Sequence, residues 1–188
     1  DMSNLSDLLP AGAGGKQVDF VASGTLGSGV TVALKADGTV EAITGVTEGV
    51  GTPVVFDAGN PQYTSAVYDA TNNKVVVAYR DQARTGYGTA VVGTVSGDTI
   101  SFGSYVYFTS SDTYETSATY DSNSNKVVIV YRDAGNSNYG KAIVGTVSGT
   151  SISFGTAVVF ESATTTYCAA AYDSTNNKVV IAYNDGDS

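Results

Sequence analysis

Apolar and polar residues alternate along the chain in the short runs that are typical of β-strands. The run 127–131 (VVIVY) is continuous, apolar and mostly β-branched, the pattern expected of an inner strand that is covered on both faces. Polar segments such as 121–125 (DSNSN) separate these runs, and their side chains can cap their own backbone in a tight turn. Beyond the first few residues, no window has the 3.6-residue period of a helix. The pattern predicts an all-β protein with very little helix.

One segment of the chain occurs three times, at a spacing of 52 residues and without insertion. It reads YDATNNKVVVAYRD from Tyr68, YDSNSNKVVIVYRD from Tyr120 and YDSTNNKVVIAYND from Tyr172. Other residues keep the same register, namely Phe56, Phe108 and Phe160, then Gly51, Gly103 and Gly155, then Gly45, Gly97 and Gly149. A period of about 50 residues that contains several short strands is typical of a propeller or a similar array.

Each repeat is predicted to form four strands. In the second repeat we expect them at Thr116–Tyr120, Lys126–Arg132, Gly140–Val147 and Ser151–Phe160. Between the last two strands, Gly149 can supply the positive φ of a tight turn at little cost.

The two ends of the repeat region complement each other. The third copy stops at Ser188, after its second strand, and the columns that it lacks correspond to residues 33–50. Residues 33–188 number 156, which is three times 52. We therefore expect 33–188 to be a single domain in which 33–50 completes the last blade, so that no sheet edge stays open.

Three blades do not close a ring, because propellers typically use four to eight. Two chains could each give three blades to a six-bladed ring, which predicts a homo-oligomer. The alternative is a β-trefoil, in which three four-stranded units fold within one chain. The apolar strand KVVVAYRD resembles the inner strands of kelch-like blades and favours the β-propeller-like architecture.

Residues 1–32 lie outside the repeats. Residues 1–10 form a polar tip with three leucines at helical spacing, and 11–15 is a flexible Gly/Ala linker. The segments Val18–Leu26 and Gly29–Leu34 are predicted to form a strand pair. The beginning lacks the basic start and the long apolar core of a secretory signal. A short amphipathic tip suits docking to a larger assembly, and a frayed terminus explains it equally well.

Composition removes several classes of function. The net charge of −9, from 9 basic and 18 acidic residues, would repel a phosphate backbone, so we expect no nucleic-acid partner. No apolar run approaches about 20 residues, so we expect no membrane insertion. The absence of His excludes Ser-His-Asp and Cys-His catalysis. Cys168 is the one cysteine, and its apolar neighbours favour a buried strand thiol over a nucleophile.

Several segments resemble a family of bacteriophage proteins. Residues 7–12 (DLLPAG), 20–26 (FVASGTL) and 36–40 (ADGTV) resemble the opening of virion proteins from tailed bacteriophages of marine bacteria. The repeat, with VVFESA and GNSNYGKAIVGTVSGTSISFGT, is similar to arrays in the same proteins, which are described as tail-fibre or structural proteins. The resemblance covers nearly the whole chain. It implies a component of the virion surface that contacts other virion proteins and displays a binding surface, and it supplies no catalytic residues.

Two groups of residues are candidates for ligand binding. The first is a Tyr-Arg-Asp column at the strand ends, which becomes Tyr-Asn-Asp in the third copy, and it consists of Tyr79, Arg80, Asp81, Tyr131, Arg132 and Asp133. A guanidinium beside a carboxylate and a ring could bind sugar hydroxyls, or Arg and Asp could pair between blades while Tyr packs in the core. The second group is Tyr87 and Tyr139, which adjoin glycines and could stack on a pyranose or cover the next blade.

A metal site and an active site have weaker support. The turns that begin at Asp69, Asp121 and Asp173 offer oxygen ligands for calcium, but an Asx turn explains them without a metal. The positions of the three arginines and four glutamates do not indicate a single active centre, so we expect neither a cofactor nor an enzyme. The sequence predicts a non-enzymatic tail or fibre module that binds host-surface glycans. The alternatives are a decoration protein that binds only virion partners and, as a minor one, a glycoside-cleaving propeller.

Overall fold

A computed structural model describes residues 21–22, 24–26, 32–42 and 51–186 of the chain. These residues form β-strands and two short 3-10 turns and contain no α-helix, so the predicted all-β class is confirmed. No helix in the described ranges is long and apolar enough to cross a membrane. The chain divides into two units, 1–49 and 50–188, and each is described by itself.

The first unit contains a small sheet with the strand order β1-β3-β2. Strand β3 (Thr39–Ala42) pairs in parallel with β1 (Val21–Ala22) and antiparallel with β2 (Val32–Leu34). The turn between β2 and β3 is closed by Asp37, whose Oδ1 accepts hydrogen bonds from the backbone N and the hydroxyl of Thr39 at 3.0 and 2.6 Å. Gly38 follows with a φ of +81°, which favours glycine.

This sheet differs from the predicted pairings. Strands β1 and β2, from the predicted pair 18–26 and 29–34, both pair with β3 and not with each other. Strands β2 and β3 belong to the segment that was expected to complete the third copy, and that completion stays a prediction. The tip at 1–10, the linker at 11–15 and residues 43–50 lie outside the described residues.

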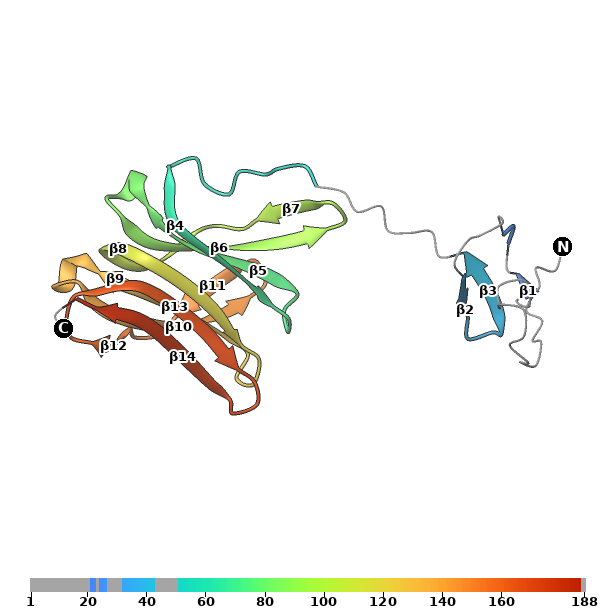
Figure 1. Cartoon of the computed structure of the whole chain (residues 1–188). Coiled ribbons are helices and arrows are strands. Elements are labelled where there is room, and N and C mark those ends of the chain that lie inside the picture. The colour runs from blue at the N-terminus through green and yellow to red at the C-terminus, as the bar shows by residue number, and fades with distance from the viewer. Residues whose placement is uncertain (1–20, 23, 27–31, 43–50, 187–188) are drawn as a thin grey trace, which may run out of the picture. The chain divides into compact units, whose positions relative to one another are not determined.

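The second unit contains the three copies, which we number as residues 54–105, 106–157 and 158–186 (Figure 1). The first copy has β4 (Pro61–Asp69), β5 (Lys74–Asp81), the 3-10 turn η2 (Gln82–Arg84), β6 (Tyr87–Ser96) and β7 (Thr99–Phe102). The second has β8 (Val106–Asp121), β9 (Lys126–Asp133), the 3-10 turn η3 (Ala134–Asn136), β10 (Tyr139–Ser148) and β11 (Ser151–Phe154). The third has β12 (Val158–Glu161), β13 (Thr165–Asp173) and β14 (Lys178–Asp185).

One long strand joins the first copy to the second. Strand β8 pairs with β6 over residues 106–112 and with β9 over residues 113–121, so it begins ten residues before the predicted strand at Thr116. The predicted strand Ser151–Phe160 is divided into β11 and β12, because these two pair with opposite ends of β10. Between them, the backbone N of Gly155 donates to the carbonyl of Val144 at 3.0 Å.

The inner strands are buried as their sequences predict. Strand β5 lies between β4 and β6, and β9 lies between β8 and β10. The main core cluster is shared by two copies, since it joins Val76 and Val92 of the first to Ile129 and Tyr131 of the second. None of the sheets in the described part of the chain closes into a ring.

The same side-chain link joins neighbouring copies twice. The backbone N of Ala118 donates to Ser65 Oγ at 3.0 Å, and the backbone N of Ala170 donates to Ser117 Oγ at 3.1 Å. The two serines are 52 residues apart. The third copy has Ala169 in this column and therefore lacks the hydroxyl. The repeat thus specifies contacts between copies as well as the strands within them.

Candidate functional site

The tyrosines of the Tyr-Arg-Asp column belong to the core. Tyr79 and Tyr131 are buried on the inner strands β5 and β9. The Tyr79 hydroxyl donates to Asp57 Oδ2 at 2.7 Å, and its burial together with this carboxylate raises its pKa. Burial, helped by the charge of Asp133, raises the pKa of Tyr131 to about 12. Both phenols therefore stay protonated and act as packing groups.

The two arginines of the column have different contacts. Arg80 Nε donates to Asp112 Oδ1 at 2.8 Å, and its Nη1 donates to the side-chain oxygens of Gln62, at 2.8 Å, and of Gln82. Both guanidinium groups lie over the ring of Tyr114, whose centroid is 4.7 Å from Arg80 Cζ and 4.6 Å from Arg132 Cζ. Arg80 therefore pairs between neighbouring copies, although its partner is Asp112 and not a member of the column.

The aspartates of the column have different surroundings in the two copies. Asp133, 3% exposed, accepts hydrogen bonds from Lys141 Nζ at 2.7 Å and from the Ser111 hydroxyl. Asp81, 5% exposed, has one carboxylate oxygen, Oδ1, that accepts no hydrogen bond from any described residue. Asp81 also borders a pocket, and this makes it the member of the column that is best placed to meet a ligand.

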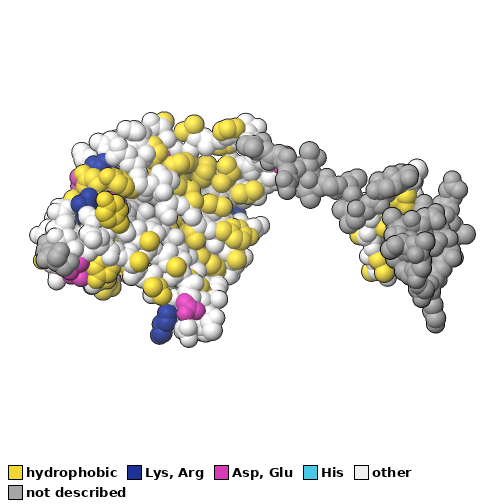
Figure 2. Space-filling model, viewed as in Figure 1, with side chains coloured by type: hydrophobic (Ala, Val, Ile, Leu, Met, Phe, Trp, Pro, Cys, Tyr) yellow, Lys and Arg dark blue, Asp and Glu magenta, His cyan; other side chains and the backbone are white. Residues whose placement is uncertain are grey.

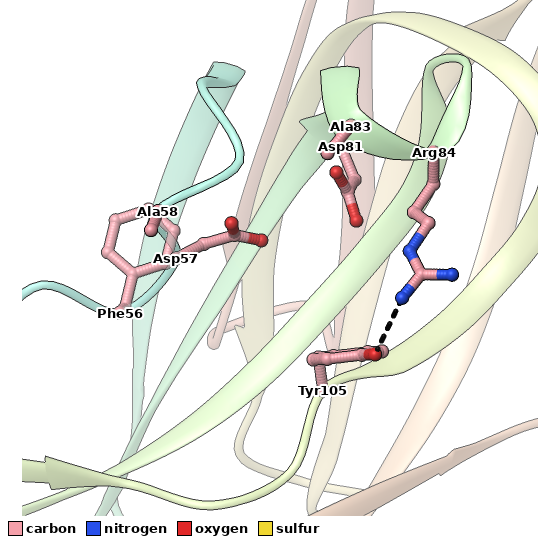
Figure 3. A pocket seen from close by; sticks show the side chains of 7 residues that line it. All are labelled: Phe56, Asp57, Ala58, Asp81, Ala83, Arg84 and Tyr105. Atoms are coloured by element: carbon pink, nitrogen blue, oxygen red, sulfur yellow. Dashed lines mark hydrogen bonds between the residues drawn. The ribbon is translucent and has the colours of Figure 1, made fainter.

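The pocket has a volume of about 330 Å³ and lies within the second unit (Figure 3). It is lined by Phe56, Asp57, Ala58, Asp81, Ala83, Arg84 and Tyr105. Arg84 Nη2 donates to the Tyr105 hydroxyl at 3.3 Å, and the Asp57 side chain extends toward Asp81. The lining therefore combines two aromatic rings, a guanidinium and two carboxylates.

A tyrosine surface continues from this pocket. The Tyr105 ring, 49% exposed, contacts that of Tyr107, 37% exposed, with their centroids 5.5 Å apart. Tyr107 meets the predicted site residue Tyr87 edge-on at the same distance. The structure thus brings Tyr87 close to the Asp81 pocket. Tyr139, its counterpart in the second copy, is half-buried, and Val159 stands there in place of Tyr107.

Sequence reasoning found Asp81 and Tyr87 but missed the rest of the pocket. Asp57, Arg84 and Tyr105 do not repeat, because the second copy has Thr109, Asn136 and Ala157 in their columns. A search for repeated residues cannot find such a site. The useful signal is the reverse one, namely columns whose residue changes from copy to copy.

The remaining candidates are occupied by local contacts. Asp121 Oδ2 accepts from Ser124 Oγ, and Asp173 Oδ2 accepts from Asn176 Nδ2, both at 2.6 Å, so these turns are Asx turns. No group of three His, Cys, Asp or Glu within the described ranges could hold a metal ion. Burial and the charge of Glu115 raise the pKa of the half-buried Cys168 to about 11, which keeps this thiol protonated and unreactive.

On the visible face of the repeat unit, hydrophobic side chains are scattered among uncharged polar ones, and few charged side chains are seen (Figure 2). Comparison with family models, with curated proteins and with solved structures found no match for the chain. The pocket must therefore be interpreted from its own chemistry.

Proposed function

We propose that the chain is a non-enzymatic carbohydrate-binding module whose sugar site is the pocket of the first copy together with Tyr105 and Tyr107. The observation that carries this proposal is the exposed Tyr105 ring at the wall of a pocket that also holds two carboxylates and a guanidinium. An aromatic ring can stack on the apolar face of a pyranose, while charged groups bind its hydroxyls. Such a combination of flat apolar area and a few polar groups is typical of small-ligand sites.

We place this module on a virion, as an exposed part of a tail or fibre that binds host-surface glycans. Support comes from the resemblance of residues 7–12, 20–26 and 36–40, and of the repeat, to tailed-bacteriophage virion proteins. Other virion proteins are then its permanent partners. Assembly into an oligomer would multiply a weak sugar site through avidity.

For the architecture we propose a β-propeller-like stack, with two chains contributing three blades each, and keep the β-trefoil as the alternative. The repeated Ser65 and Ser117 links support a stack, since they join each copy to the next in the same manner. Light scattering distinguishes the two, because the propeller requires a dimer and a monomer favours the trefoil.

The sugar site can be tested on a glycan array with the purified protein. We expect binding to surface polysaccharides, a loss of this binding in Tyr105→Ala, and little change in the control variant Tyr139→Ala, whose ring is the second-copy counterpart of Tyr87. If the wild-type protein binds no glycan on the array, the decoration protein that binds only virion partners becomes the better account.

A second candidate is glycoside cleavage, because Asp57 and Asp81 form a carboxylate pair at the pocket. Asp57 is already engaged, since its Oδ2 accepts from the Tyr79 hydroxyl and its Oδ1 from the backbone N of Gly59 at 2.5 Å. These contacts favour a binding role over that of a free acid or base. Release of reducing sugar from host polysaccharide, abolished in Asp81→Asn, would show cleavage instead.

A further inference from the structure

In the second copy, side chains of the protein itself supply the partners of the buried aspartate, whereas in the first copy one oxygen of the corresponding aspartate has none among the described residues. Asp133 lies at the end of β9, and its carboxylate binds the ammonium group of Lys141 and the hydroxyl of Ser111. Lys141 is half-buried, so this ammonium group is largely withdrawn from water. The second copy thus shows which group satisfies a carboxylate at this position of the fold.

The first copy lacks both partners. Thr89 stands in the column of Lys141, and Gly59 stands in the column of Ser111. Asp81 is nevertheless as buried as Asp133, and its Oδ1 has no hydrogen-bond partner among the described residues. An ionised carboxylate in such a place is costly unless a donor or a cation reaches it.

The surrounding residues have changed in a concerted way. In the second copy Ser111 occupies the space beside Gly135, where an added Cβ would collide with the serine hydroxyl. The first copy reverses this pair, with Gly59 opposite Ala83, and a Cβ on Gly59 would lie 2.8 Å from Ala83 Cβ. In the first copy the Ala83 methyl group therefore takes the place of the Ser111 side chain, and it offers no hydrogen-bond donor to Asp81.

A second carboxylate faces the same space. A Cβ added to Gly59 would lie 2.8 Å from Asp57 Oδ1 and 3.3 Å from Asp81 Oδ1, so these two oxygens approach a common point. Thr109 replaces Asp57 in the second copy, whereas the third copy keeps an acid, Glu161, in this column. In Figure 3 the Asp81 carboxylate lies between the Asp57 side chain and Arg84, which is bonded to Tyr105. The lining holds two carboxylates and one guanidinium, so its net charge is negative.

We infer that this carboxylate pair binds a primary ammonium group carried by the ligand, and that the sugar bound by the first copy is an amino sugar with a free amine. The inference rests on the proposed function, since it names the sugar class for the same pocket. The ligand's ammonium group takes the role that Lys141 has in the second copy. Arg84 then faces hydroxyls of the same sugar, while the Tyr105 ring stacks on its apolar face.

Calorimetric titration of the wild-type protein with glucosamine, N-acetylglucosamine and glucose tests this inference. Acetylation removes the positive charge and keeps the ring, so it isolates the ammonium group. We expect glucosamine to bind about 10- to 100-fold more tightly than the other two, the range given by a charge-assisted hydrogen bond. Equal affinities for the three sugars would overturn the inference and leave carbohydrate binding in place. If none of them binds, the amino-sugar inference and the proposed sugar site both fail.

A pair of variants locates the effect. Asp81→Asn should weaken glucosamine binding about 10-fold or more and change glucose binding little, because it removes the charge at the open position. Asp133→Asn is the matched control in the second copy and should leave the preference for glucosamine unchanged. Loss of that preference in the control alone would contradict the assignment to the first copy. The sugar series uses the unaltered protein, so the inference stays testable even if a variant does not fold.

Discussion

The first and second copies share their strands and their buried apolar columns but use one acidic column in opposite ways. In the second copy Asp133 is part of an internal ion pair with Lys141. In the first copy Asp81 borders a pocket and has an oxygen without a partner in the described chain. A tandem repeat can therefore keep one backbone and one core while a few polar substitutions turn a structural contact into a binding position.

The largest expected contrast concerns the stability of these two aspartates. Asp133→Asn should lower the free energy of unfolding by about 3 kcal/mol, because it leaves the half-buried Lys141 ammonium group without its carboxylate. Asp81→Asn should leave stability unchanged or raise it, since it removes a buried charge that lacks a partner. Urea unfolding of the two variants measures the difference. Equal losses would mean that Asp81 has an internal partner after all.

The arginines provide a second contrast. Arg80→Met should cost about 2 kcal/mol, because the guanidinium bonds to Asp112 and to two glutamines. Arg132→Met should cost about 0.5 kcal/mol, because its buried Nε has no partner in the described residues and it mainly covers the Tyr114 ring. Thermal unfolding is sufficient to rank the two variants, and the reverse order would contradict this account of the two interfaces.

The serine links should behave alike in both interfaces. Ser65→Ala and Ser117→Ala should each lower the unfolding free energy by about 1 kcal/mol, since each leaves a backbone N–H of the next copy without its acceptor. Ala169→Ser in the third copy serves as the control and should have little effect. Clearly unequal losses, measured in urea, would show that the copies are not joined in the same way.

The smallest effect concerns acid. Hydrogen bonds from Ser124 lower the pKa of Asp121, and hydrogen bonds from Asn176 lower the pKa of Asp173. A carboxyl group whose folded pKa is depressed adds stability above its ordinary pKa, and this is lost as the pH falls through the lowered value. Asp121→Asn should therefore make the acid-induced loss of stability shallower, as followed by circular dichroism below about pH 4. If the acid profile is unchanged, the hydrogen bonds to Asp121 do not contribute to the stability of the protein.

Much of the repeat unit could be predicted from the sequence. The apolar run at 127–131 predicted a buried inner strand, and β9 lies between two others. The turn at Gly149, with a φ of +60°, is also where the pattern placed it. These features depend on local chemistry and on a repeat of constant length, and both can be recognised in a single sequence.

Other features depend on partners that a local pattern does not specify. Periodicity could not show that β8 would pair with two strands in succession. The pocket was missed because Asp57, Arg84 and Tyr105 break the repeat. The repeat column identified Asp81 as a candidate. Only the comparison of the structures around Asp81 and Asp133 showed that Asp81 lacks the partners of Asp133.

The most direct test of the central claim is a ¹³C NMR titration that follows the aspartate side-chain carboxyl carbons as glucosamine is added at slightly acidic pH. We expect saturable shifts at Asp57 and Asp81 and none at Asp133, because the carboxylate of Asp133 is already paired with Lys141. No shift at Asp81, or the same shifts with N-acetylglucosamine, would contradict it.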